Sequence, residues 1–402
     1  MYKTRTLAAK VTRVSEAFKV VMLTGMRQVG KTTLLRQLSA QKRRYVTLDN
    51  PKDLLMAKTE PEFFVQSYPP PVFIDEIQYA PELFPHIKML VDASERKGLV
   101  WMTGSQQFLL MKGVSESLAG RMALLDLLGF SIYERTGQGA LQKPFIPSPN
   151  PAAVVAHKDL KETFEVIWKG AYPGVSEVGS DEWPTFYGSY VRTYLERDVR
   201  QLSKVGDELA FLRFLKVLAA RTGQELNLAD VARNVEVAPN TAKNWLSVLE
   251  SSGVIYLLQP YFNNPTKRLI KTPKLYFWDT GLCAYLAEWN TPQTLAAGAM
   301  SGAFFETFVV TEIIKSYWHN GKKPSLFFYR DNQQVEIDLL IAQDGMLYPV
   351  EIKKTGNPTK EMVKNFALRI PGQKMGYGTL ICLTDKPRPL TANANAISIW
   401  DI

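Results

Sequence analysis

The spacing of apolar residues predicts alternating strands and helices in the first third of the chain. An apolar run at Val20–Thr24 is followed by Gly25–Thr32 and then by a helical pattern that starts at Thr33. Two further apolar runs, Val72–Ile74 and Leu99–Gln107, are typical of strands buried on both faces. Repeated strand–loop–helix units predict a parallel sheet that binds its ligand at the carboxyl ends of the strands.

The middle of the chain predicts a linker, two helices and a helix-turn-helix. Residues 136–153 are rich in Pro, Gly and Ser and have no apolar period, so we expect a linker or an exposed loop there. Leu160–Gly170 and Trp183–Leu202 have helical spacing and predict a helical lid over the ligand site of the sheet. Leu228–Val235 and Thr241–Ser251 predict two helices joined by a short turn, and the following "VIYLLQPY" predicts a strand. This order is typical of a winged helix.

A β-hairpin is predicted near the carboxyl end, in "VEIDLLIAQDGMLYPVEIKK". Asp344-Gly345 is a strong signal for a two-residue hairpin turn. Such a turn places Leu339 opposite Val350 and makes one face of the hairpin apolar. A shift of one residue would spoil this face, so the pattern also fixes the register.

The other face of this hairpin brings acidic residues together. Asp338 stands opposite Glu351, with Lys353 two residues further along the same face. Like charges in opposed positions destabilise a hairpin, and a divalent cation would resolve the conflict. Glu306, on the apolar face of the preceding helix, is a further candidate metal ligand. The alternative is that Lys353 forms salt bridges with solvated acids and no metal binds.

The sequence from Gly25 to Thr32 reads G-x-x-x-x-G-K-T between a strand and a helix, which is the context of a phosphate-binding loop. Its backbone N–H groups and the helix N-terminus are suited to phosphate oxygens. Lys31 is expected to contact the β- and γ-phosphates, and the Thr32 hydroxyl to bind Mg²⁺. The expected ATP-binding residues are Gly25, Arg27, Gln28, Val29, Gly30, Lys31, Thr32 and Thr33, with Ser105 as a polar sensor of the γ-phosphate.

Two acidic residues end the second predicted strand, in "PVFIDEIQ". Asp75 is placed to hold Mg²⁺, and Glu76 to orient and deprotonate an attacking water. Residues 18–135 thereby resemble an AAA+-type P-loop ATPase. That resemblance implies that Arg121, just before another strand, is an arginine finger acting on a neighbouring subunit of a homo-oligomer, with a hexamer as one option. An ordinary surface arginine is the alternative.

Composition narrows the chemistry further. The chain has 402 residues, which predicts two to four domains, and a net charge of +9 favours an acidic partner such as nucleic acid. Two cysteines and three histidines make a disulfide framework or a zinc site unexpected and leave carboxylate-held hard cations as the expected metals. No apolar run has the length of a membrane span, and the first residues lack a secretion signal, so we expect a cytoplasmic protein.

The acidic hairpin and its helix resemble the restriction-endonuclease-like PD-(D/E)xK nucleases. That resemblance implies Asp338, Glu351 and Lys353 as catalytic residues, with Glu306, Asp338 and Glu351 binding Mg²⁺ or Mn²⁺. The whole order resembles bacterial and archaeal AAA+-type ATPases fused to a domain of unknown function, with Met26 where that group usually has proline. The expected α/β domains are an ATPase core (1–140), linker and lid (141–222), winged helix-turn-helix (223–275) and nuclease-like domain (276–402).

The leading hypothesis is a Mg²⁺-dependent ATPase that acts with DNA. Base-facing candidates on the second helix are Asn240, Thr241, Lys243 and Asn244. A basic stretch follows, with Lys267, Arg268, Lys271 and Lys274, and a second sensor is expected among Arg192, Arg197 and Arg200. The rival hypotheses are a nucleotide-dependent scaffold or regulator whose inactive nuclease-like fold binds protein, and a chaperone-like remodeller of proteins.

Overall fold

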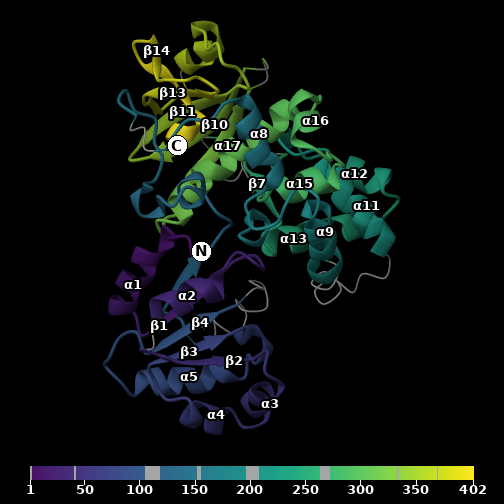
Figure 1. The fold of residues 1–402 in the computed structure, drawn as a ribbon. Helices are drawn as coiled ribbons and strands as arrows, with labels where there is room; N and C mark the ends of the chain where they lie inside the picture. The colour runs from purple at the N-terminus through teal and green to yellow at the C-terminus, as the bar shows by residue number, and fades with distance from the viewer. Residues whose placement is uncertain are drawn as a thin grey trace.

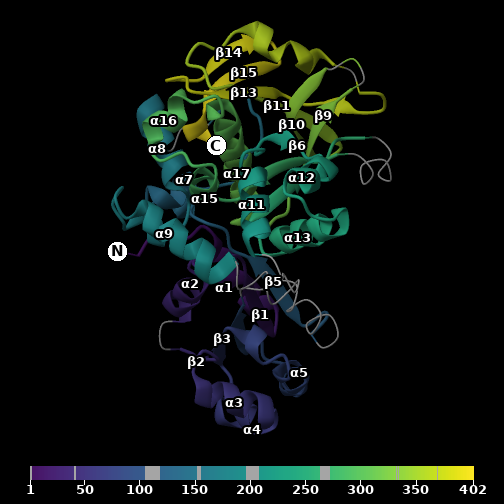
Figure 2. The same cartoon turned by 90° about the vertical axis from the view of Figure 1, so that its right-hand side faces the viewer.

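The computed structural model describes residues 2–39, 42–104, 118–151, 155–195, 208–262, 272–331, 333, 335–368 and 370–402. A parallel sheet near the amino terminus lies at one end of the molecule and a mixed sheet near the carboxyl terminus at the other (Figure 1). Helices of the middle region lie between the two sheets, to the right in Figure 1 and facing the viewer in Figure 2. Ser105, Arg197, Arg200, Lys267, Arg268 and Lys271 fall outside the described residues.

The amino-terminal part is a five-stranded parallel sheet of order β2-β3-β4-β1-β5 with helices on both faces. Its elements are α1 (Leu7–Ala17), β1 (Val20–Thr24), α2 (Lys31–Ser39), β2 (Arg44–Thr47), α3 (Pro51–Thr59), α4 (Pro61–Ser67), β3 (Val72–Asp75), α5 (Leu83–Asp92), β4 (Val100–Thr103), β5 (Met122–Asp126) and α7 (Ile132–Arg135). Alternate residues of β1 enter different cores, because Val21 packs in the cluster that holds α1 and α2, and Met22 in the cluster that holds α5. A strand buried on both faces needs a continuous apolar run, which is why the sequence pattern predicted β1 without error.

The middle region contains short helices and a three-stranded antiparallel sheet of order β6-β8-β7. Its elements are α8 (Leu160–Lys169), α9 (Trp183–Tyr190), a π-helix (Val191–Leu195), α11 (Glu208–Ala219), β6 (Gln224–Glu225), α12 (Leu228–Asn234), α13 (Pro239–Ser251), β7 (Ile255–Leu258), β8 (Lys274–Phe277), α15 (Thr280–Leu286) and α16 (Pro292–Ala297). Helix α13 begins two residues earlier than predicted, because Pro239 fits the first turn of a helix. Trp245 and Leu249 face inward from it, as expected.

The carboxyl-terminal part is a mixed sheet of order β14-β15-β13-β11-β10-β9, with the short β12 beside β11. Its elements are α17 (Ser301–Trp318), β9 (Ser325–Arg330), β10 (Glu336–Gln343), β11 (Met346–Ile352), a 3₁₀ segment (Lys360–Ala367), β12 (Lys374–Met375), β13 (Gly378–Cys382), β14 (Arg388–Thr391) and β15 (Ala394–Ser398). The hairpin β10–β11 has the predicted register, with Leu339 opposite Val350. Both turn residues, Asp344 and Gly345, have positive φ, as a tight hairpin turn requires.

The segment expected to be a linker or an exposed loop is instead partly buried against α17. Phe145 is buried; its N–H donates to Ser316 Oγ (2.9 Å), and its carbonyl accepts from the Tyr317 hydroxyl (2.7 Å). The prediction of exposure was wrong because Pro and Gly interrupt the apolar period without removing the apolar residues. A segment with no regular structure can still bury its side chains when a neighbouring helix satisfies its backbone.

Helix α17 is also tied to the amino-terminal part by buried charges. Glu312 Oε2 accepts from the Ile132 N–H (2.8 Å), and Lys315 Nζ donates to the Phe130 carbonyl (3.2 Å). Glu312 and Lys315 form an ion pair with each other at 2.8 Å, with both side chains almost fully buried. Helix α17, which packs against the carboxyl-terminal sheet, therefore also contacts the segment that follows β5.

Candidate functional site

The loop between β1 and α2 has the backbone geometry of a phosphate-binding loop. Gly25, Gln28 and Gly30 have φ of 140°, 62° and 91°, a region that L-residues rarely adopt. A Cβ added to Gly25 would lie 2.1 Å from the Leu127 carbonyl oxygen, so only glycine fits there. Helix α2 starts at Lys31, two residues earlier than predicted, and places Lys31, Thr32 and Thr33 in its first turn.

Lys31 is buried within this loop. Its ammonium donates to the carbonyls of Gly25 (3.0 Å) and Met26 (2.7 Å), and the residue is 5% exposed. The loop thus curls around the lysine, with Arg27, Gln28 and Val29 forming its outer turn. This arrangement keeps a positive charge at the point where a phosphate would meet the helix N-terminus.

Asp75 lies at the carboxyl end of β3, next to Thr32. The Thr32 hydroxyl donates to Asp75 Oδ1 at 2.9 Å, and the Thr103 hydroxyl at the end of β4 donates to the same oxygen. Tyr45 donates to Asp75 Oδ2 at 3.0 Å, and burial followed by the Asp75 charge raises the pKa of Tyr45 to about 12. Hydroxyl and carboxylate oxygens are the ligands that Mg²⁺ prefers, so this donor set fits the ion.

Glu76 follows Asp75 in a left-handed conformation, with φ of 58°. Its N–H donates to Thr103 Oγ1 (3.2 Å), and its carboxylate accepts a hydrogen bond from the Gln78 side-chain amide. Left-handed backbone costs about 1 kcal/mol or more for a residue other than glycine and is often found at functional sites. Asp75 and Glu76 therefore both lie at the sheet edge that carries the phosphate loop, as the sequence predicted.

Several residues around the loop were missed by the sequence patterns. Arg5, which precedes α1, donates to the Val29 carbonyl (2.7 Å) and the Leu128 carbonyl (2.6 Å). The Tyr172 hydroxyl, in the turn after α8, lies 3.5 Å from Met26 Sδ. Helices α8 and α9 themselves pack against α15, so this turn is the part of the expected lid that reaches the loop. Contacts between such distant positions carry no local sequence signal.

Arg121 lies at the amino ends of the strands, whereas the phosphate loop lies at their carboxyl ends. It precedes Met122, which pairs with Val20 at the amino end of β1, whereas the loop follows the carboxyl end of that strand. Its guanidinium donates to both carboxylate oxygens of Asp92, at 3.0 Å for Oδ2. Arg121 therefore cannot reach the nucleotide of its own chain across a five-residue strand, which is about 16 Å long.

A second group of predicted residues lines one cavity between the carboxyl-terminal sheet and the three-stranded sheet. The cavity has a volume of about 420 Å³. It is lined by Gly223, Gln224, Glu225, Lys274, Glu306, Arg330, Glu336, Asp338, Glu351, Lys353 and Asn365. The structure thus brings all four predicted residues of the acidic hairpin and its helix to one place, which we call the carboxylate pocket.

Asp338 and Glu351 lie where the hairpin ladder ends. Asp338 Oδ2 accepts from the Ile352 N–H (2.9 Å), and Lys353 Nζ lies 3.3 Å from Asp338 and 2.7 Å from Glu351. The Glu351 Oε2 atom is buried and has no hydrogen-bond partner. Burial, reinforced by the Asp338 charge, raises the pKa of Glu351 to about 8 despite Lys353.

Glu306 is held by two side chains that the sequence patterns did not connect with it. Lys274 Nζ lies 3.4 Å from Glu306 and 2.7 Å from Glu336, and the Tyr276 hydroxyl donates to Glu306 Oε1 at 2.7 Å. Burial would lower the pKa of Lys274, but the charges of Glu306, Asp338 and Glu336 outweigh it and raise that pKa. Lys274 was expected to belong to a basic DNA-contacting stretch, whereas its ammonium points into the carboxylate pocket.

The pocket does not fit a divalent cation as it is arranged here. Among the described residues, no group of three or more His, Cys, Asp and Glu side chains converges closely enough to hold a metal ion. The carboxylates are instead shared between Lys274 and Lys353. The expected metal ligands Glu306, Asp338 and Glu351 therefore line one cavity without forming a metal-binding cluster.

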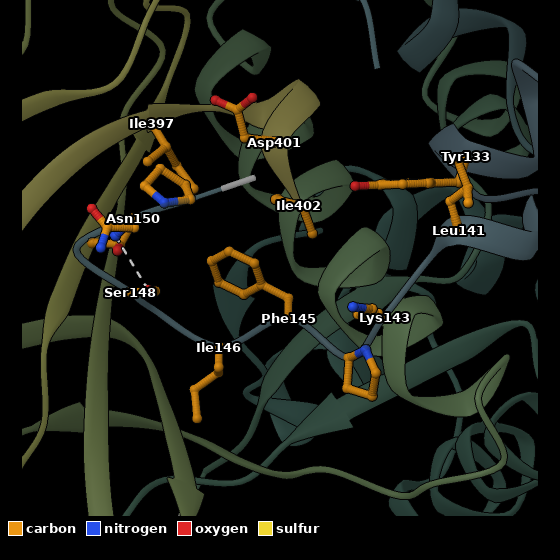
Figure 3. Close-up of a pocket in the computed structure, with 13 residues that line it drawn as sticks. Tyr133, Leu141, Lys143, Phe145, Ile146, Ser148, Asn150, Ile397, Asp401 and Ile402 are labelled. Carbon is orange, nitrogen blue, oxygen red and sulfur yellow. Dashed lines mark hydrogen bonds between the residues drawn. The ribbon is translucent and has the colours of Figure 1, made fainter. Parts of the chain in front are cut away.

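Another cavity, of about 340 Å³, lies between the segment after α7 and the last residues of the chain (Figure 3). Its walls are mostly apolar, with Phe145, Ile146, Ile397 and Ile402 among them, and Lys143 at one side. It contains none of the predicted site residues.

Sequence comparison places the chain among known proteins. Residues 17–136 match the AAA domain model, residues 160–293 a domain of unknown function (DUF8612), and residues 301–402 a domain of unknown function (DUF4143). The chain is 31% identical over 357 residues to the uncharacterized proteins Rv2008c of Mycobacterium tuberculosis and Mb2031c of Mycobacterium bovis, covering 88% of this chain and 75% of each relative. The chain belongs to the family of these two proteins. This family member has an AAA-type, nucleotide-binding ATPase domain on an α/β P-loop fold.

Solved structures with partial likeness include other ATPases. The Walker-type ATPase PABY2304 of Pyrococcus abyssi is 14% identical, with a TM-score of 0.44 over 70% of this chain and 94% of that one. DnaA of Aquifex aeolicus, bound to AMPPCP, is 14% identical, with a TM-score of 0.30 over 61% and 86%. Both TM-scores are low, so the assignment rests on the sequence matches. Across the described part of this family member, no helix is long and apolar enough to cross a membrane.

Proposed function

We propose that this protein binds and hydrolyses ATP with Mg²⁺ and acts with DNA. The observation that carries the first half is the Thr32–Asp75 contact at 2.9 Å, beside a loop curled around Lys31. In this proposal Lys31 contacts the β- and γ-phosphates, and Thr32 and Asp75 hold Mg²⁺, directly or through water. Glu76 orients the attacking water and takes its proton.

Hydrolysis is tested with purified Lys31→Ala protein. Without the Lys31 ammonium, the protein should no longer release inorganic phosphate from ATP. Its melting temperature without nucleotide should equal that of the wild type, which would show that the fold is intact. Turnover equal to that of the wild type would remove the central assignment.

The DNA half rests on α12, α13 and the sheet β6-β8-β7, which we interpret as a winged helix. The exposed face of α13 offers Asn240, Lys243 and Asn244, with Thr241 half-buried beside them. The net charge of +9 adds long-range attraction for phosphates. Binding to a DNA duplex should weaken steeply with added salt, because each phosphate contact releases a counterion. Filter binding at a series of salt concentrations measures this dependence. A DNA affinity that does not change with salt concentration would argue against DNA as the partner.

The acids of the carboxylate pocket are paired with Lys274 and Lys353 in this arrangement. We propose that, once these lysines release them, the pocket cleaves nucleic acid in a metal-dependent reaction, on the basis of Asp338, Glu351 and Lys353. The supporting observation is the buried Glu351 Oε2 without a partner. Asp338→Ala should stop any Mg²⁺- or Mn²⁺-dependent cleavage. No cleavage by the wild type of single- or double-stranded DNA or RNA would retire this activity.

The rival function is a nucleotide-dependent scaffold whose nuclease-like domain is inactive. The observation in its favour is that Lys274 and Lys353 already neutralise the pocket acids. A scaffold predicts that ATP turnover responds to a protein partner and stays the same with and without DNA. Comparing ATPase rates with single-stranded DNA, double-stranded DNA and unfolded polypeptide separates the scaffold, the DNA-acting ATPase and a protein remodeller.

We also propose that Arg121 acts across an interface between copies of the chain. Arg121 lies at the amino end of β5, too far from the phosphate loop of its own chain to contact that nucleotide. This position supports a contact with the nucleotide of a neighbouring subunit. The solution mass measured with and without a non-hydrolysable ATP analogue tests the assembly. ATPase activity that is independent of protein concentration would argue against it.

A further inference from the structure

The carboxylate pocket is closed by a lysine from another sheet. Lys274 is the first residue of β8, the central strand of β6-β8-β7, and its side chain is 6% exposed. Its ammonium lies 2.7 Å from Glu336 and 3.4 Å from Glu306. Tyr276, two residues along the same face of β8, donates to Glu306 Oε1 at 2.7 Å. Strand β8 thus presents two donors to acids that belong to α17 and β10.

Lys274 and Tyr276 contact carboxylates that a bound cation would need as ligands. A hard cation binds several oxygen ligands that point at one centre. Glu336 and Glu306 point instead at Lys274, while Asp338 and Glu351 point at Lys353. The pocket therefore contains two separate lysine-centred groups in place of one metal-centred group.

The two lysines are not equivalent. The Lys353 side chain is 44% exposed and follows the hairpin strand directly, so it can turn toward solvent without moving the backbone. The Lys274 side chain is 6% exposed and lies on a strand paired on both sides. Lys274 therefore has less freedom than Lys353 to turn away from the acids into solvent.

We infer that Lys274 is a built-in cation that occupies the carboxylate pocket and keeps a divalent cation out of it. This inference rests on the proposed role of the pocket as a cation site. It assigns control of that site to Lys274, the first residue of β8.

Removal of Lys274 should therefore expose a cation site that the wild type masks. Without the ammonium, the partly buried carboxylates of Glu306 and Glu336 lose their countercharge, and partly desolvated, unpaired carboxylates attract a cation. We expect Lys274→Met to bind Mn²⁺ about tenfold or more tightly than the parent protein, since cation affinity rises with the number of charged ligands available.

The experiment uses full-length protein carrying Asp75→Asn, so that the nucleotide site does not contribute ions. Mn²⁺ binding is measured by calorimetry without nucleotide, for this parent and for the same protein with Lys274→Met. Lys374→Met is the matched control, because Lys374 is an exposed lysine on β12 outside the pocket and its loss changes the net charge equally. Lys274→Met should gain one Mn²⁺ site and be stabilised against heat by Mn²⁺, and the control should match the parent.

A second variant guards against misfolding. Lys274→Met together with Glu336→Gln removes both partners of a partly buried ion pair, which proteins tolerate better than the loss of one partner. It leaves Glu306 free to join Asp338 and Glu351, so it should also gain the Mn²⁺ site. Adding Glu306→Gln should abolish that gain.

Equal Mn²⁺ affinity in parent, Lys274→Met and the double variant overturns the inference, and so does an equal gain in Lys374→Met. The outcome is separate from the fate of the proposed cleavage. A Lys274→Met protein that binds Mn²⁺ tightly but cuts no nucleic acid supports the masking role of Lys274 and removes nuclease activity from the proposed function.

Discussion

Arg5 donates a hydrogen bond to the carbonyl of Val29 inside the phosphate loop, at 2.7 Å. The same guanidinium donates to the Leu128 carbonyl (2.6 Å) and forms an ion pair with Glu134 at 3.0 Å. Arg5 is 3% exposed, so these contacts are shielded from water. The shape of the loop therefore depends on a residue that lies before the first helix.

Replacing Arg5 by Met should weaken both the fold and nucleotide binding. It leaves Glu134 buried without its countercharge, a type of change that costs about 3–5 kcal/mol. We expect the free energy of unfolding to fall by about that amount in urea titrations, and the affinity for a fluorescent ATP analogue to fall with it. Arg13→Met is the control, since Arg13 is exposed on α1. Equal stability of the two variants would contradict the role given to Arg5.

Gly25→Ala should abolish nucleotide binding. The added Cβ would meet the Leu127 carbonyl oxygen at 2.1 Å, and φ of 140° is strained for alanine. Gly120→Ala tests the strain alone, because Gly120 also has positive φ (75°) but has no atom within 4 Å of an added Cβ. Binding of the ATP analogue should disappear in the first variant and persist in the second. Measurable affinity in Gly25→Ala would show that the loop can open away from Leu127.

Local sequence was enough to predict the phosphate loop and the hairpin register. In both, the signal lies in a few adjacent residues: glycines that allow positive φ, and an Asp344-Gly345 turn that fixes which residues face each other. A two-residue periodicity then carries the register from Leu339 to Gln343. The acidic hairpin residues and Glu306 line one pocket, although the ladder itself ends at Leu339 and Val350.

Contacts between segments far apart in the sequence could not be predicted from local sequence patterns. Lys274 looked like part of a basic stretch, because its neighbours in sequence are basic, yet its contacts are with Glu306 and Glu336 from later elements. Proline cannot donate a ladder hydrogen bond and is typical of edge strands, yet Pro349 lies on β11, which is between β10 and β13. The proline is tolerated there because β12 pairs with Met346 and Leu347 and β13 with Val350–Ile352, so Pro349 falls between the two ladders.

Tyr45→Phe should raise the Mg²⁺ concentration needed for ATP turnover. The Tyr45 hydroxyl fixes Asp75 Oδ2 at 3.0 Å, and residues that orient a metal ligand commonly contribute about tenfold or more to metal affinity. We expect about a tenfold rise in the Mg²⁺ concentration for half-maximal rate, with little change in the rate at saturating Mg²⁺. Tyr68→Phe is the control, since Tyr68 donates to Asp53 instead. An unchanged Mg²⁺ requirement would remove Tyr45 from the site.

His319 should make the fold less stable in mild acid. This residue ends α17, is fully buried, and has no hydrogen-bond partner on either ring nitrogen. Its imidazole faces Glu134 at 3.4 Å, with Arg5 and Lys315 as nearby positive charges. Burial lowers the pKa of His319 to about 4, and Arg5 and Lys315 add to this against the opposing effect of Glu134.

The sign of the pH dependence follows from proton uptake. In the unfolded chain a histidine takes up a proton near pH 6.5, whereas folded His319 stays neutral down to about pH 4. The unfolded state therefore binds more protons in this window, and the free energy of unfolding falls as pH falls, by about 3 kcal/mol at most. His319→Gln should flatten the decline in melting temperature between pH 7 and pH 5, while His86→Gln, at a half-exposed position on α5, should leave it unchanged. Parallel declines in all three proteins would show that other groups control acid stability, and that the interface between α17 and the amino-terminal part does not sense protons through His319.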